Sequence, residues 1–415
     1  MKILMPVLIT CCGLTAAVNY ASAQTWTQSG LPNACWSAIA SSADGSRLVL
    51  TEVPDGWIYA SSNSGVSWIS NTFPNLGWWS VASSADGNKL AAAAGGNFTP
   101  GPIYTSINAG TTWVSNSAPV APWTSIASSA DGTKLVAVAA VNWVYTSSDS
   151  GTTWTSNSLP IATNQWLMVH SSADGTKLVV AGCLGPVYTS TDSGTTWTAP
   201  INAPSANWQA FALSADGRKI VMVGSMNLIY SSVDYGATWQ SNSVPGITSW
   251  TGIASSADGN RLAAVAPGVG IFISTNAGVT WTQDPYPFVI DPWGGQHFGN
   301  QLSIVSSADG AKLVLIPGET FVPFDNTSGA IVPNDFVWTS SSAPAPQLDL
   351  APAGANLILS WTVPSTNFVL QQSEDLITAN WVTLTNTPTL NLTNLNDEVT
   401  VSPTNGNGFF QLISQ

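Results

Sequence analysis

The chain has 415 residues, of which 7% are charged, and its 22 acidic and 9 basic residues give a formal net charge of −13. This balance excludes nucleic acids and anionic membrane surfaces as preferred partners, because both repel an acidic protein. Four cysteines are too few for a disulfide-rich scaffold, and the length allows two domains.

The first 23 residues have the parts of a secretory signal peptide. Lys2 supplies the basic start, residues 3–18 are mostly apolar, and Ala21-Ser22-Ala23 places small residues at a cleavage site. A lipoprotein anchor on the Cys11-Cys12 pair is the alternative, but the residue before the pair is bulky and the apolar run continues past it. We therefore expect a secreted, extracellular or periplasmic protein cleaved after Ala23. No later stretch has the ~20 apolar residues of a membrane span.

Two short motifs repeat along the mature chain. The tetrapeptide Ser-Ala-Asp-Gly occurs seven times at spacings of 42 to 51 residues, with its aspartate at Asp44, Asp86, Asp131, Asp174, Asp216, Asp258 and Asp309. A second motif, S-x-[DN]-x-G-x-[ST]-W, occurs between these turns at residues 61–68, 106–113, 147–154, 190–197, 232–239 and 274–281. Repeats of this period indicate stacked structural units.

Each unit has the strand pattern of one propeller blade. In the fourth unit, apolar or β-branched runs at residues 166–169, 177–180, 187–189 and 195–198 predict four short strands. Glycines in the two turns supply the positive φ that such hairpins need.

The second motif resembles the Asp box, or bacterial neuraminidase repeat, of sialidases, sortilin-type receptors and photosystem assembly factors. This resemblance implies a hairpin between the third and fourth strands of a blade, with a structural and not a catalytic role. It implies architecture alone, because one fold serves many functions.

The two ends of the repeat region complement each other. The seventh unit stops after residues 336–340, without a fourth strand, and residues 24–27 have the sequence of a fourth strand without a blade. Pairing them would close the ring and remove its exposed edges. We therefore predict an all-β fold in which residues 24–341 form a seven-bladed β-propeller, with the N-terminal strand completing blade seven.

The repeat ends at a Pro-rich linker, residues 342–346. Residues 347–415 then alternate like short antiparallel strands and resemble the fibronectin- or immunoglobulin-like β-sandwich modules of secreted bacterial proteins. We expect a spacer or stabilising cap, with attachment to a surface or glycan as the alternative.

The basic residues follow the repeat closely. Apart from Arg218, each mature cation stands three residues after a repeat aspartate, at Arg47, Lys89, Lys134, Lys177, Lys219, Arg261 and Lys312. Sialidase resemblance would imply three arginines converging on a substrate carboxylate at the opposite face, but every arginine here belongs to the turns. We therefore expect no sialidase activity.

The acidic residues outside the repeats and the second domain gather in one sector. We predict that they lie in loops of blades one and seven, on the face opposite the Asp boxes, together with aromatic residues and a histidine of the same long insertions. The candidate binding residues are Glu52, Asp55, Asp284, Tyr286, Asp291, Trp293, His297, Glu319, Asp325 and Asp335. Insertions on one face of a repeat scaffold often bind ligands, but they could also merely cover the ring closure.

A tryptophan stands eight residues before six of the seven repeat aspartates, at Trp36, Trp78, Trp123, Trp166, Trp208 and Trp250. Such a ring of aromatics could stack on sugars, but we favour packing between blades. His170 replaces a small residue of its slot, and we expect it to be packed and not catalytic. With only His170 and His297 present, and Cys35 and Cys183 far apart, we expect no metal site, cofactor or disulfide.

These observations favour a monomeric, non-catalytic binding or scaffold protein whose partner is a protein or a glycan. Two alternatives remain open. One is a glycoside-active enzyme that uses a carboxylate pair in the loops of blades one and seven. The other, implied only by the family resemblance, is an assembly factor with a chaperone role.

Overall fold

The structure is a computed structural model that describes residues 25–31, 34, 36–53, 56–71, 76–96, 99–140, 143–159, 167–182, 186–199, 206–225, 228–247, 249–266, 269–284, 303–316, 337–341, 348–353, 356–362, 368–373, 382–384, 388–391, 393, 396–401 and 409–414. Its regular elements within these ranges are all β-strands. The predicted signal peptide and the linker at residues 342–346 lie outside them.

The repeat units form antiparallel sheets that we number in chain order. Sheet 1 contains β2 (Trp36–Ser41), β3 (Leu48–Glu52), β4 (Ile58–Ser61) and β5 (Ile69–Asn71). Sheet 2 contains β6 (Trp78–Ser83), β7 (Leu90–Ala94), β8 (Ile103–Ser106) and β9 (Val114–Ser115). Sheet 3 contains β10 (Trp123–Ser128), β11 (Leu135–Ala139), β12 (Trp143–Ser147) and β13 (Thr155–Ser158).

The remaining sheets of this region follow the same order with two variations. Sheet 4 contains β14 (Leu167–Ser171), β15 (Leu178–Gly182) and β16 (Val187–Ser190). Sheet 5 contains β17 (Trp208–Leu213), β18 (Ile220–Gly224), β19 (Ile229–Ser232) and β20 (Gln240–Asn242). Sheet 6 contains β21 (Gly252–Ser255), β22 (Leu262–Ala266), β23 (Gly270–Ser274) and β24 (Thr282–Asp284). Sheet 7 contains β25 (Ser303–Ser306), β26 (Lys312–Ile316), β27 (Trp338–Ser341) and the N-terminal β1 (Thr25–Gln28).

Sheet 4 differs from the expected pattern of four strands. Its predicted fourth strand is reduced to one bridge, in which Thr189 and Thr198 exchange both backbone hydrogen bonds. Two residues later the chain has Pro200, which has no N–H to continue the ladder.

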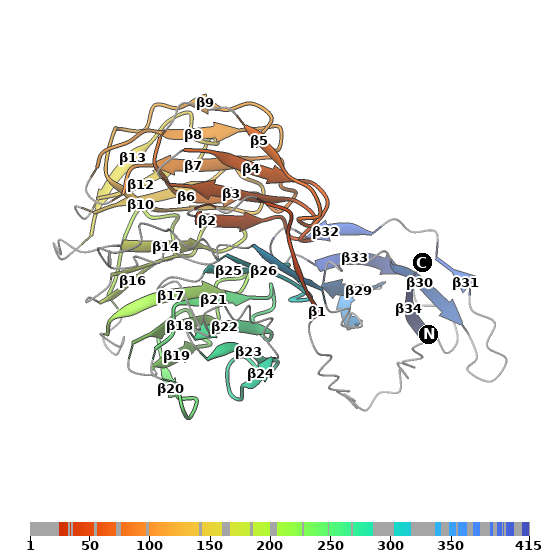
Figure 1. The fold of residues 1–415 in the computed structure, drawn as a ribbon. Helices are drawn as coiled ribbons and strands as arrows, with labels where there is room; N and C mark the ends of the chain where they lie inside the picture. The colour runs from red at the N-terminus through yellow and green to blue at the C-terminus, as the bar shows by residue number, and fades with distance from the viewer. Residues whose placement is uncertain are drawn as a thin grey trace, which may run out of the picture.

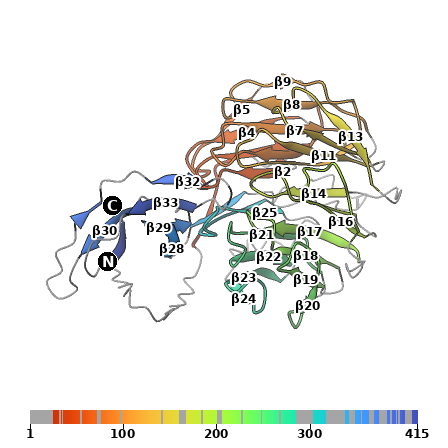
Figure 2. The ribbon, with the colours of Figure 1, turned by 180° about the vertical axis from the view of Figure 1, so that it is seen from behind.

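The first strands of the sheets pack against one another in a closed cycle. β2 packs on β6, β6 on β10, β10 on β14, β14 on β17, β17 on β21, β21 on β25, and β25 returns to β2. The later strands of each sheet stack outward from this cycle (Figure 1), and the view from behind shows the same arrangement (Figure 2). The result is a β-propeller-like all-β fold.

A ring of backbone hydrogen bonds joins the Ser-Ala-Asp-Gly turns. Each alanine N–H donates to the alanine carbonyl of the next turn at 2.6–2.8 Å, in the order Ala43, Ala85, Ala130, Ala173, Ala215, Ala257, Ala308 and back to Ala43. These bonds connect every sheet to its neighbour at one end of the ring. The repeat of this tetrapeptide is therefore explained by contacts between sheets as well as by the turn itself.

The turn cations and glycines form a second set of contacts between sheets. At each turn glycine a Cβ would lie 2.6–2.9 Å from the Lys or Arg side chain of the preceding sheet, and φ is between 66° and 74°. Only glycine tolerates both the close approach and the backbone angle. Several of these lysines also bond the next turn: Lys312 Nζ donates to the Asp44 carbonyl at 3.0 Å and Lys134 Nζ to the Asp174 carbonyl at 3.0 Å.

The Asp boxes are closed by their own hydrogen bonds, as the box of sheet 3 illustrates. Ser147 Oγ donates to Asp149 Oδ1 at 2.8 Å and accepts from the Gly151 N–H at 2.9 Å. The Thr153 N–H donates to Asp149 Oδ1 at 2.8 Å, and Trp154 Nε1 donates to the Gly151 carbonyl at 3.1 Å. These bonds fix the hairpin between the third and fourth strands.

The N-terminal strand β1 pairs antiparallel with β27, from Thr25 opposite Ser341 to Gln28 opposite Trp338. Residues from the two ends of the repeat region therefore share one sheet, and Trp26 packs on the core between sheets 6 and 7.

After β27 the chain enters a C-terminal module of two further sheets. One contains β28 (Asp349–Ala353), β29 (Asn356–Thr362), β33 (Asn396–Val401) and β32 (Thr389–Asn391), and the other contains β31 (Val382–Thr383), β30 (Phe368–Ser373) and β34 (Phe409–Ser414). The module has its own core of Leu359, Trp361, Leu370, Val399, Val401 and Phe410. Within the described ranges, the chain contains no helix long and apolar enough to cross a lipid bilayer.

Candidate functional site

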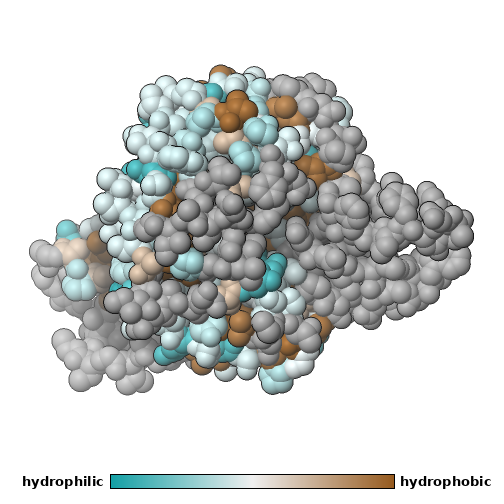
Figure 3. All heavy atoms as spheres, turned by 90° about the vertical axis from the view of Figure 1, so that its left-hand side faces the viewer, coloured by the Kyte–Doolittle hydropathy of each residue, from teal (hydrophilic) through white to brown (hydrophobic). Residues whose placement is uncertain are grey.

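The ring has two faces, which we name by the segments that they carry. The turn face carries the Ser-Ala-Asp-Gly turns and the Asp boxes, and the loop face, opposite, carries the connections between second and third strands and between consecutive sheets. Figure 3 views the loop face, where the described surface is mostly hydrophilic with scattered hydrophobic patches. Most candidate binding residues lie outside the described residues: Asp55, Tyr286, Asp291, Trp293, His297, Glu319, Asp325 and Asp335.

Glu52 is the last residue of β3 and not a loop residue as predicted. Its side chain is buried and shares a face of the strand with Leu48 and Leu50, which pack on sheet 7. Desolvation raises the pKa of Tyr59, and the nearby Glu52 carboxylate raises it further. Glu52 is thus a buried carboxyl group at the boundary between sheets 1 and 7.

Asp284 also lies in a strand, at the end of β24, and not in a loop as predicted. Its carboxylate is buried and accepts a hydrogen bond from Trp26 Nε1 at 3.0 Å. Arg261 interacts electrostatically with the same carboxylate. Asp284 therefore joins sheet 6 to the N-terminal strand of sheet 7.

The repeat explains why an acid stands at this position. Sheets 1 and 5 have Asn71 and Asn242 in the same slot, and their side-chain N–H groups donate to the Gly110 and Gly278 carbonyls of the next Asp box at 2.5 and 3.0 Å. The hairpin that would carry this carbonyl is missing between β27 and β1, because these two strands come from opposite ends of the repeat region and no direct connection joins them. Asp284 supplies an acceptor for the Trp26 indole N–H. In sheets 1, 3, 4, 5 and 6 the equivalent indole donates to the carbonyl of the box glycine. The contact of Asp284 is thus a variant of the repeat.

The structure does not bring these two candidate acids together. Glu52 faces sheet 7 from sheet 1, whereas Asp284 binds sheet 7 from sheet 6. Among the described residues, no group of three or more His, Cys, Asp or Glu side chains could hold a metal ion.

The described tryptophans of the predicted aromatic ring are buried: Trp36, Trp78, Trp123, Trp208 and Trp250. Each packs edge-on against an aromatic residue of its own sheet, such as Tyr59, Tyr104 and Tyr145, with ring centroids 5.2–5.6 Å apart. Trp78 Nε1 and Trp123 Nε1 donate to the Gly56 and Gly101 carbonyls of the preceding sheet at 2.8 and 2.9 Å. Their ring faces are not open to a sugar. Trp166 lies outside the described residues.

His170, in contrast, has an exposed side chain on the first strand of sheet 4. Its ring lies 4.6 Å from that of Phe211 in sheet 5. The surrounding strands desolvate the imidazole and lower the pKa of His170, although solvent still reaches part of the ring. We find no second titratable group bonded to it among the described residues.

The arginines lie on the turn face and do not converge. Arg47 donates to Asn88 in the next turn, the Arg261 side chain crosses Gly310, and Arg218 lies 5.9 Å from the centre of the Tyr235 ring. The described chain therefore has no arginine cluster for a substrate carboxylate.

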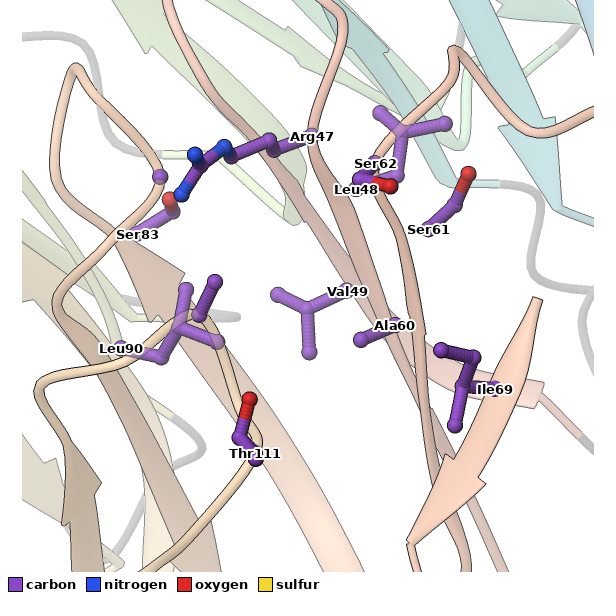
Figure 4. A pocket seen from close by; sticks show the side chains of 12 residues that line it. Arg47, Leu48, Val49, Ala60, Ser61, Ser62, Ile69, Ser83, Leu90 and Thr111 are labelled. Atoms are coloured by element: carbon purple, nitrogen blue, oxygen red, sulfur yellow. The ribbon is translucent and has the colours of Figure 1, made fainter. Parts of the chain in front are cut away.

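Sequence reasoning missed two equivalent grooves between sheets on the turn face. The groove between sheets 1 and 2 has a volume of about 180 Å³ and apolar walls that include Val49, Ala60, Ile69 and Leu90, with Arg47 at one end (Figure 4). The groove between sheets 3 and 4 measures about 280 Å³, and it has Thr146 and Thr155 in place of Ala60 and Ile69. The one sequence signal for these grooves is the change of residue type in two repeat slots, from Ala60 and Ile69 in sheet 1 to Thr146 and Thr155 in sheet 3.

Comparison with known proteins gives a likeness of fold. No protein-family model and no curated protein matches the chain. Among solved structures, YCF48 bound to D1 peptide is similar with a TM-score of 0.55 and 14% identity, over 79% of this chain and 99% of that chain. YCF48 from Cyanidioschyzon merolae is similar with a TM-score of 0.56 and 13% identity, over 77% of this chain and 98% of that chain.

Enzymes share the fold as well. The GH74 xyloglucanase from Xanthomonas campestris has a TM-score of 0.56 and 14% identity, over 82% of this chain but only 59% of that chain. The GH74 enzyme from Niastella koreensis is similar with a TM-score of 0.55 and 18% identity, over the same shares of the two chains. The chain thus spans nearly all of a YCF48 chain and little more than half of a GH74 chain.

Proposed function

We propose that this chain is a secreted, non-catalytic binding protein in which a seven-bladed β-propeller presents its loop face to a partner protein. In this proposal residues 1–23 are a signal peptide and sheets 1 to 7 are the seven blades. Residues 347–415 are a fibronectin- or immunoglobulin-like β-sandwich. A glycan is the second class of partner, since sugars also bind polar loops that carry aromatic residues.

One observation carries the choice of a protein partner. The chain matches 99% of a YCF48 chain whose structure was solved with a bound peptide, so the part shared with this chain is nearly the whole of that chain. The GH74 chains extend well beyond the part that this chain matches, because only 59% of each is covered. We infer peptide or protein binding by analogy of fold.

The described residues support a binding role over a catalytic one. The turn aspartates, the cations and Asp284 are engaged in contacts within or between sheets. A two-carboxylate mechanism needs acids about 5–10 Å apart, and the two described candidates lie on opposite sides of sheet 7. The loops that depart from the repeat remain for recognition.

The test is to probe the labelled full-length chain against a peptide array and a glycan array. Saturable binding to peptides is expected. Binding to glycans alone would replace the protein partner with a lectin role, and turnover of a bound glycan would establish the enzyme alternative. Absence of binding on both arrays would contradict the proposal.

A further inference from the structure

The turn face is chemically divided into two sectors. The Asp boxes of sheets 3, 4 and 5 carry Asp149, Asp192 and Asp234, whereas those of sheets 6, 1 and 2 carry Asn276, Asn63 and Asn108. Hydrogen bonds from the Thr153 and Thr196 side chains and N–H groups, with help from the box serines, lower the pKa of Asp149 and Asp192 to about 2. The boxes of the first sector therefore carry carboxylates at neutral pH, with Arg218 next to the box of sheet 5, whereas the boxes of the second sector are neutral.

The neutral sector also exposes more aliphatic side chains than the anionic one, in which Val233 (57%) and Tyr235 (39%) of sheet 5 are the large hydrophobic residues exposed at a described box. In sheets 1 and 2, four aliphatic side chains are exposed at the boxes and outer strands: Val66 (80%), Ile69 (72%), Ile107 (75%) and Val114 (66%). Sheets 3 and 4 have serine or threonine in the equivalent slots, at Ser148, Thr152, Thr155, Thr191, Thr195 and Thr198. Ile69 also lines the groove in Figure 4, so this sector offers exposed aliphatic side chains beside a groove, as interaction surfaces do.

The C-terminal module leaves the ring on this face. Ser341, the last residue of β27, pairs with Lys312, which directly follows the turn of sheet 7. Figures 1 and 2 both show the module on that side of the ring. The next strand begins at Asp349, so the connection reaches at most about 28 Å, which keeps the module close to sheets 6, 7 and 1. A short tether gives a weak contact a high effective concentration.

The charge of the module matches one sector and not the other. Residues 347–415 contain five acidic residues, Asp349, Glu374, Asp375, Asp397 and Glu398, and no lysine or arginine. Like charges would repel this module from the boxes of sheets 3 and 4, whereas the boxes of sheets 6, 1 and 2 add no such penalty. No strand of the module packs extensively on a ring strand within the described part of the chain, so the patch is open in this conformation.

We propose that the C-terminal module docks on the neutral, apolar sector of the turn face, over the groove between sheets 1 and 2. The Asn-for-Asp exchanges in these boxes and the exposed aliphatic side chains form its docking surface. This contact leaves the loop face free, so the proposal stands whether or not the loop face binds a peptide.

The test is small-angle X-ray scattering of the full chain, with light scattering to give its mass. In the Asn63→Asp/Asn108→Asp variant each box keeps its geometry, because Asp149 occupies the same position in sheet 3. The docked module should then be repelled, and the radius of gyration and maximum dimension should increase at low salt. They should return to wild-type values near 1 M salt, where the Debye length is about 3 Å. Ile69→Asp should increase both dimensions at all salt concentrations.

The matched control is Ser148→Asp/Thr191→Asp, which adds the same charge at exposed box positions of sheets 3 and 4. It should leave the dimensions unchanged, and melting curves should show that all variants stay folded. An extended wild type whose dimensions none of the variants changes would show that the module does not dock here. A doubled mass in the wild type that Ile69→Asp abolishes would assign the surface to a second copy, and either result would overturn the proposal.

Discussion

The turn face and the loop face of the ring differ in how closely they follow the repeat. On the turn face, alanines, glycines, cations and aspartates recur in fixed slots and bond either their own turn or the next sheet. The connections that we expect on the loop face depart from the repeat in sequence, above all between sheets 6 and 7 and within sheet 7. Substitutions in the regular slots should therefore reduce stability, whereas substitutions in the irregular loops should change binding alone.

The largest effect is expected at a turn glycine. In Gly175→Ala the new Cβ would lie 2.7 Å from Lys134 Cδ, at a φ of 66°, so both the backbone and the contact with sheet 3 are strained. We expect a loss of about 2–3 kcal/mol in the free energy of unfolding, measured by denaturant titration. Gly246→Ala is the control, because it has a positive φ but open space around it, and it should lose only about 1 kcal/mol. Equal losses would show that the contact between sheets adds nothing.

A smaller loss is expected when a turn serine is removed. Ser172 Oγ accepts from the Lys177 N–H at 3.0 Å and donates to Asp174 at 2.5 Å, in a buried position. Ser172→Ala leaves that N–H without its acceptor, which should cost about 1–3 kcal/mol. The exposed Ser148→Ala serves as the control and should stay within about 0.5 kcal/mol of the wild type. If Ser172→Ala were as stable as the wild type, the hydrogen bonds of the turn would not contribute to stability as we propose.

The ring closure offers a third comparison. Asp284→Asn replaces a charged acceptor of the Trp26 N–H with a neutral one, which should reduce stability by about 1 kcal/mol. Asn242→Asp, the reverse exchange between sheets 5 and 6, places a carboxylate against the Gly278 carbonyl and should also be destabilising. If Asp284→Asn were silent in urea titration while peptide binding was lost, Asp284 would belong to the binding site.

Sequence patterns were sufficient for the regular part of the molecule. The turn and box motifs predicted the sheets, the positions of the cations and the pairing partner of residues 24–27, because each repeat slot has one structural role. The same patterns wrongly placed Glu52 and Asp284 in loops. Neither acid belongs to the two motifs, and so neither was assigned to a strand of the repeat. The missing fourth strand of sheet 4 was also overlooked, although Pro200 signals it. The grooves depend on packing between sheets, which no single motif encodes.

The smallest expected effect concerns acid stability. The folded-state pKa of Asp149 and Asp192 is about 2, below the unfolded value of about 3.9. Their contribution is therefore complete above about pH 4 and is lost as the pH falls toward 2. Asp149→Asn/Asp192→Asn copies the boxes of sheets 1 and 2 and should flatten the fall of the urea midpoint over this range. An unchanged pH profile would show that Asp149 and Asp192 do not contribute to stability between about pH 4 and pH 2.

The binding role of the loop face is tested most directly on the two arrays with three labelled chains. These are the wild type, a Trp293→Ala/Asp325→Asn variant with changes in the inserted loops, and the Ser148→Asp/Thr191→Asp variant with changes on the turn face. We predict that the loop variant binds the peptides selected by the wild type at least about tenfold more weakly, equivalent to one lost contact of about 1.4 kcal/mol, and that the turn-face variant binds like the wild type. Equal binding by all three chains, or a loss confined to the turn-face variant, would contradict the proposed role of the loop face.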